Sequence, residues 1–129
     1  MLIHTCNWAV SSSSLDHQVS LAVRPLFHNC YSCWLSPREA RVFSDAVLEC
    51  AARVECKCGG GYDGLLWRPT YNSALDLACG GGVAVESYAT SIGVTILRRR
   101  SYSVAVAPME ALELACRLWV QSQPTVIAA

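Results

Sequence analysis

The sequence predicts an α+β protein built from two βββα repeats, in which six or seven antiparallel strands form one sheet and two helices cover one of its faces. Two observations carry this prediction. Two segments of helical periodicity each begin at a proline, and three short runs with the two-residue period of a strand precede each of them. The second helical segment also repeats residues of the first at matching positions. We expect one domain over 1–129, with a repeat over about 1–54, a linker over about 55–73 and a repeat over about 74–122.

Short alternating runs mark the expected strands of both repeats. An additional strand is expected at 74–79, where it turns through Gly80, Gly81 and Gly82 into the second repeat. The other expected strands are 2–10, 17–23 and 29–35 in the first repeat, and 83–89, 93–100 and 101–107 in the second.

The first helix is expected over 36–54. Ser36 can cap it, Pro37 suits the first helical turn because its missing N–H is not needed there, and Glu39 completes a capping box. Charged side chains occupy one side of this helix and apolar side chains the other. The apolar arc, which we expect to face the core, consists of Phe43, Val47, Cys50, Ala51 and Val54.

The second helix is predicted to be the structural counterpart of the first, as the product of a duplication. Its first turn also begins with a proline and carries a glutamate two residues later. The aligned pairs are Pro37 with Pro108, Glu39 with Glu110, Ala40 with Ala111, Phe43 with Leu114, and Val47 with Leu118.

The two helices differ on the side that faces away from the core. Where the first helix carries charges, the second carries an apolar strip. Water is an unfavourable environment for such a strip, so we predict that it is the interface with a partner protein or with a second copy of the chain in a homodimer. The alternative is that another part of the same chain covers it. The strip consists of Met109, Leu112, Cys116, Trp119 and Val120.

Composition and charge exclude several functional classes. Apolar residues make up 53% of the chain and charged residues 16%, which is typical of a packed globular protein. Ten basic residues balance ten acidic ones, so general affinity for nucleic acid is not expected. No apolar run is long enough for a membrane helix, and no export signal is recognisable. We therefore expect a cytoplasmic protein whose eight cysteines are reduced thiols, most of them buried.

Four cysteines have spacings that would suit a zinc site. Cys30 and Cys33 followed by Cys56 and Cys58 form the pattern C-x2-C…C-x-C, and four thiolates can hold a structural zinc ion. However, Cys30 and Cys33 would point to opposite faces of a strand, and buried cysteine is common simply as a small apolar residue. We expect no metal or other cofactor, and zinc at these four residues is the alternative.

An arginine cluster is the candidate contact for an anion or a partner. Arg98 and Arg100 would share one face of a strand, with Arg99 between them, and Trp67 and Arg68 in the linker could add to the contact. The alternative is that the arginines form a solvated strand end that discourages edge-to-edge pairing. No complete set of catalytic groups is recognisable, so we expect no enzymatic activity.

The segments Leu35–Arg41 and Ala107–Ala111 follow short strands and open Ala-rich helices. This pattern resembles small, mostly uncharacterised proteins encoded by phages of high-GC bacteria. The resemblance implies an accessory protein that acts by binding in the host cytoplasm, and it transfers no catalytic residues. We expect a non-enzymatic protein-binding module of phage or mobile-element type, for example an inhibitor of a host or defence protein. The alternative is a zinc-stabilised module that binds nucleic acid through Arg98–Arg100.

Overall fold

The computed structural model describes residues 7–13, 17–25, 29–55, 71–88 and 91–123 of the chain. The element types and their order agree with the sequence prediction, and the fold class is α+β. The first half contains β1 (Trp8–Ser12), β2 (Val19–Val23), β3 (Tyr31–Leu35) and α1 (Pro37–Glu55). The second half contains β4 (Tyr71–Asp76), β5 (Gly82–Ser87), β6 (Ile92–Leu97), β7 (Ser101–Val106) and α2 (Pro108–Gln121).

The described strands form two antiparallel sheets, whereas the sequence predicted a single sheet. The first sheet has the order β1-β2-β3 and the second the order β4-β5-β6-β7. Alternation along a strand predicts which side chains face a core, but it does not predict which strands are neighbours across a helix and a long connection. The alternating pattern was therefore not sufficient to predict how many sheets the strands form.

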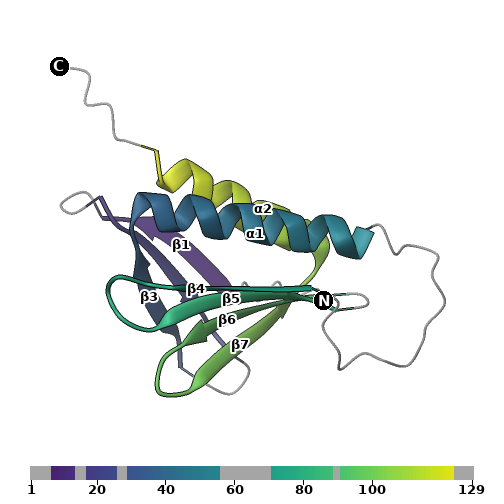
Figure 1. Cartoon of the computed structure of the whole chain (residues 1–129), viewed down its shortest axis with the longest axis horizontal. Coiled ribbons are helices and arrows are strands. Elements are labelled where there is room, and N and C mark those ends of the chain that lie inside the picture. The colour runs from purple at the N-terminus through teal and green to yellow at the C-terminus, as the bar shows by residue number, and fades with distance from the viewer. Residues whose placement is uncertain (1–6, 14–16, 26–28, 56–70, 89–90, 124–129) are drawn as a thin grey trace, which may run out of the picture.

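The two sheets and two helices enclose one core (Figure 1). β2 contacts β6 and β7, and β3 contacts β6, so the sheets face one another. The helices lie side by side along one side of the sheets and run in opposite directions. Each helix packs against the sheet of the other half: α1 follows β3 but contacts mainly β5 and β4, and α2 follows β7 but contacts β1.

The start of α1 has the predicted capping box. The backbone N–H of Ser36 donates to Glu39 Oε1 at 2.8 Å, and the backbone N–H of Glu39 donates to Ser36 Oγ at 3.1 Å. Two N–H groups that the helix itself cannot satisfy are thereby bonded. At the start of α2, Ala107 supplies no side-chain cap, although Pro108 occupies the first turn as predicted. The predicted apolar arc of α1 is buried throughout.

Two residues that the predicted duplication aligns contact each other. The Ser44 hydroxyl donates to the backbone carbonyl of Ala115 at 2.8 Å, and these residues are 71 positions apart. Contacts between equivalent residues are what a two-fold relation produces close to its axis. The same spacing relates several pairs that are buried in both halves, namely Cys33 and Val104, Leu35 and Val106, Ala40 and Ala111, Phe43 and Leu114, and Val47 and Leu118. A duplication that produced the two halves stays a prediction.

Candidate protein-binding groove

A groove of about 380 Å³ runs between α1 and α2 on the outer side of the helix layer. Both helices contribute to it, and most of its lining residues occupy equivalent positions on the two helices. The lining consists of Ser44, Asp45 and Leu48 from α1, and of Leu112, Ala115, Cys116 and Trp119 from α2.

The floor of the groove is formed at a direct contact between the two helices. Ser44 and Ala115 are both buried there, and their small side chains permit a close approach of the two backbones. The Ser44 hydroxyl is satisfied by its bond to the Ala115 carbonyl. A buried hydroxyl without such an acceptor would destabilise the fold, so this bond favours the close crossing.

The walls of the groove are mainly apolar and open to solvent. Leu48 is 43% exposed and Trp119 is 48% exposed, while Leu112 is half-buried against the core. The Arg41 guanidinium lies 5.8 Å from the centroid of the Trp119 ring. Arg41 also donates to the Ser122 hydroxyl and carbonyl, both at 3.4 Å. These contacts restrict the indole at one end of the groove, because a cation over an aromatic face is attracted to it.

Charge is distributed unequally along the groove. Asp45 on α1 is exposed, and its counterpart on α2 is the uncharged Cys116. The α2 wall is therefore apolar, and the α1 wall places the Asp45 carboxylate beside Leu48. Such a groove can take up apolar side chains and orient them through a single charged contact.

The predicted apolar strip of α2 is divided between the groove and the open surface. Leu112, Cys116 and Trp119 line the groove, whereas Met109, 74% exposed, and Val120 lie outside its lining. The contribution of α1 was missed in the sequence. On α1, Leu48 lies between the charged residues Asp45 and Glu49, so the sequence did not single it out. Its alignment with Trp119, 71 residues later, is the signal that could have identified it.

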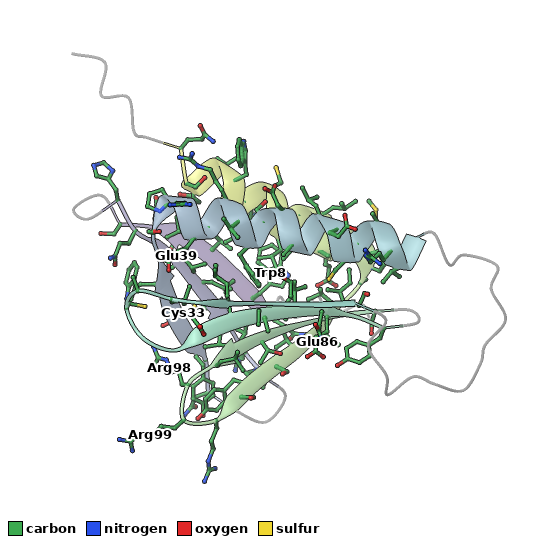
Figure 2. All side chains as sticks on the ribbon, in the orientation of Figure 1. Trp8, Cys33, Glu39, Glu86, Arg98 and Arg99 are labelled. Carbon is green, nitrogen blue, oxygen red and sulfur yellow. The ribbon has the colours of Figure 1, made fainter. Side chains whose placement is uncertain are left out.

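The arginine cluster lies far from the groove. β6 ends at Leu97, so Arg98–Arg100 form the turn into β7. The prediction of a strand that extends to residue 100, with Arg98 and Arg100 on one face of it, is therefore wrong. The Arg98 side chain donates to the backbone carbonyl of Ser32 at 2.6 Å and thereby links the two sheets. Figure 2 shows Arg98 and Arg99 at the end of the molecule away from the helices. Trp67 and Arg68 lie outside the described residues.

The described cysteines only partly match the expectation of buried thiols. Cys33 and Cys50 are buried, but Cys30, Cys79 and Cys116 are exposed free thiols. Burial raises the pKa of the Cys33 thiol to about 12, with a further contribution from Cys79, and burial raises the pKa of Cys50 to about 11. The apolar character of cysteine therefore did not distinguish cysteines in the core from cysteines in a turn, such as Cys79, or in the groove, such as Cys116.

The predicted zinc ligands are only partly described. Cys56 and Cys58 lie outside the described residues, and Cys30 is exposed while Cys33 is buried. Among the residues that the structure does describe, no group of three or more His, Cys, Asp or Glu side chains is placed to hold a metal ion. The four-cysteine zinc site therefore stays the alternative to the expectation of no metal.

Comparisons with protein-family models, with curated proteins and with solved structures find no match. Within the described ranges, no helix has the length and apolar character needed to cross a lipid bilayer. The geometry of the groove is thus the basis for a functional proposal.

Proposed function

We propose that the chain is a non-enzymatic protein-binding module that takes an amphipathic helix of a partner protein into the groove between α1 and α2. The observation that carries the proposal is the open groove of about 380 Å³ with exposed apolar side chains on both walls. Recognition of a helix by a groove places apolar anchors from one face of the ligand helix into such a surface. Leu48, Leu112 and Trp119 supply apolar contacts for those anchors.

The polar groups of the groove indicate the chemistry of the partner. Asp45 is exposed beside Leu48, so a lysine or arginine flanking the apolar face of the partner helix would pair with it. Trp119, whose ring lies under Arg41, supplies a large aromatic contact of the kind that often dominates binding energy. In its narrower form, the proposal is that a phage or mobile element uses this module to inhibit a host or defence protein.

Two substitutions on α1 provide a matched test of the groove. Leu48 is 43% exposed and lines the groove, whereas Val42 is 47% exposed and does not. Leu48→Glu should abolish capture of a partner from cells of the source organism, and Val42→Glu should retain it. The captured protein, once purified, should form a complex with wild type and Val42→Glu in size-exclusion chromatography with light scattering.

The outcome that contradicts the proposed function is equally specific. A partner that binds Leu48→Glu and wild type with equal affinity does not use the groove. Circular dichroism of both variants checks that the substituted, solvent-exposed positions leave the fold intact.

A further inference from the structure

We infer that the outer edge of β1 is a dimerisation surface, at which β1 of a second copy pairs antiparallel and joins the two three-stranded sheets into one. This surface is separate from the groove, so a dimer formed there leaves the groove free for a partner. The inference follows from hydrogen-bond direction along β1, from the strand that occupies the equivalent place in the other half, and from the residues that border the edge.

The backbone groups of Val10 and Ser12 point away from β2. The N–H of Ser13 donates to the carbonyl of Gln18 at 2.8 Å, and the N–H of Arg24 donates to the carbonyl of Asn7 at 2.7 Å. In an antiparallel pair, successive residues alternate between bonding their neighbour strand and facing away from it. Since 7 and 13 face β2, the N–H and C=O groups of Val10 and Ser12 face the outer edge.

In the second half of the chain, the equivalent edge is covered by β4. Across the first sheet, neighbouring strands align Val10, Leu21 and Cys33. Across the second sheet, they align Val85, Val94 and Val104. The two rows correspond because Val104 lies 71 residues after Cys33, the spacing that also relates Ser44 to Ala115. Val85 pairs with Ser73 of β4. No strand among the described residues pairs with the outer edge of β1, so the place that corresponds to β4 is open.

The β1 edge lacks the features that usually prevent strand pairing. Its sequence WAVSS contains no charged residue and no proline. By contrast, carbonyls of β3 are occupied by side chains: Arg98 donates to the Ser32 carbonyl at 2.6 Å, and the Cys79 thiol donates to the Trp34 carbonyl at 3.0 Å. An uncharged, extended edge of this kind favours the addition of another strand.

The residues of α2 beside β1 favour a second copy as the added strand. Arg117 pairs with Glu113 at 3.1 Å and lies 5.9 Å from the centroid of the Trp8 ring. Because α2 contacts β1, a two-fold axis at Val10 would bring α2 of the second copy to the same edge. Glu113 and Arg117 are both more than half exposed, so each can pair with the opposite charge of the other copy. The surface is thus self-complementary in charge, as an isologous interface requires.

Pairing through Val10 also defines which side chains meet across the interface. Val10 lies opposite Val10 of the second copy, and Ala9 lies opposite Ser11. Ala9 and Ser11 are exposed on the outer face of the sheet, so charges can be introduced there without disturbing the core. Like charges directly opposite each other destabilise a strand pair, and opposite charges stabilise it.

This geometry permits a test by charge exchange in the full-length chain. Wild type should be a dimer in sedimentation velocity, whereas Ala9→Glu with Ser11→Glu should be a monomer, and so should Ala9→Lys with Ser11→Lys. An equimolar mixture of the two variants should restore the dimer, which shows that both are folded. Leu48→Glu should remain dimeric, because the groove does not take part.

Three results would overturn the inference. These are a wild-type chain that is monomeric at every concentration, a dimer that both charged variants retain, and a dimer that Leu48→Glu dissociates. The last result would assign self-association to the groove and away from β1.

Discussion

The rings of Tyr31 and Tyr102 stack with their centroids 3.5 Å apart and an interplanar angle of 15°. The two tyrosines lie 71 residues apart, the spacing that also relates Ser44 to Ala115. One pair joins the beginnings of β3 and β7, and the other joins the middles of α1 and α2. Residues that the predicted duplication aligns therefore meet both between the sheets and between the helices. The duplication itself stays a prediction.

We expect Tyr31 and Tyr102 to stabilise the fold jointly. Each single substitution to Ala should lower the free energy of unfolding, and the double variant should lose less than the sum of the two. A coupling energy of about 0.5–1.5 kcal/mol is expected for an aromatic pair in contact. Urea unfolding of the wild type, both single variants and the double variant measures it. Strict additivity would show that the stack contributes nothing.

Glu39 is expected to stabilise the fold in a pH-dependent way. Burial opposes ionisation of Glu39, but hydrogen bonds from the backbone N–H groups of Ser36 and Ala78 outweigh it and lower its pKa. A lowered pKa in the folded state means that the stabilisation is complete above the unfolded value of about 4.3 and is lost as the pH falls through the folded value. Glu39→Ala should lower the free energy of unfolding, measured in urea, by about 1 kcal/mol at neutral pH and by less in acid.

Glu110 is the matched control for Glu39. It occupies the equivalent position on α2, but Ala107 supplies no side-chain cap there, and Glu110 is exposed. Glu110→Ala should therefore change the free energy of unfolding by less than Glu39→Ala. Equal losses at every pH would contradict the role assigned to the capping box and to the bond with Ala78.

The described thiols should separate into two classes of reactivity. The thiolate is the reactive form, so the raised pKa values of Cys33 and Cys50 and their burial should make both slow to alkylate at pH 8. The exposed thiols Cys30, Cys79 and Cys116 should react first. Mass spectrometry of peptides after brief iodoacetamide treatment measures the order. Early modification of Cys33 in the folded protein would contradict the described core.

Arg98 and Arg99 should differ although they are neighbours. Arg98→Ala removes the bond to the Ser32 carbonyl and should lower the free energy of unfolding by about 0.5–1.5 kcal/mol. Arg99→Ala removes an exposed side chain and should change it little. Thermal or urea unfolding makes the comparison. An equal effect of both substitutions would argue against a structural role for Arg98.

Much of the fold could be predicted from local sequence signals. The capping box at Ser36 and Glu39 marked the start of α1, and the glycines marked the turn into β5, in which Gly80 and Gly81 lie with positive φ while Gly82 already begins the strand. The division of the strands between two sheets could not be predicted, because it depends on contacts between halves that alternation does not encode. β4 was also expected at 74–79 and is found at Tyr71–Asp76, a shift towards the residues that pair with Ser87.

The candidate site was only half visible in the sequence. The apolar strip of α2 was recognisable because its residues contradict the usual amphipathic pattern. The contribution of Leu48, Ser44 and Asp45 depends on the crossing of α1 and α2, where Ser44 bonds the Ala115 carbonyl. That crossing is a tertiary relation, so no property of α1 by itself predicts it.

Two tryptophans of similar exposure permit the most direct test of the proposed groove. Trp119 is 48% exposed in the groove, and Trp34 is 43% exposed on β3. Hydroxyl-radical footprinting, with and without the purified partner, measures the oxidation of each side chain by mass spectrometry. The groove proposal predicts that the partner protects Trp119 and leaves Trp34 unchanged. Protection of Trp34 with continued oxidation of Trp119 would contradict it.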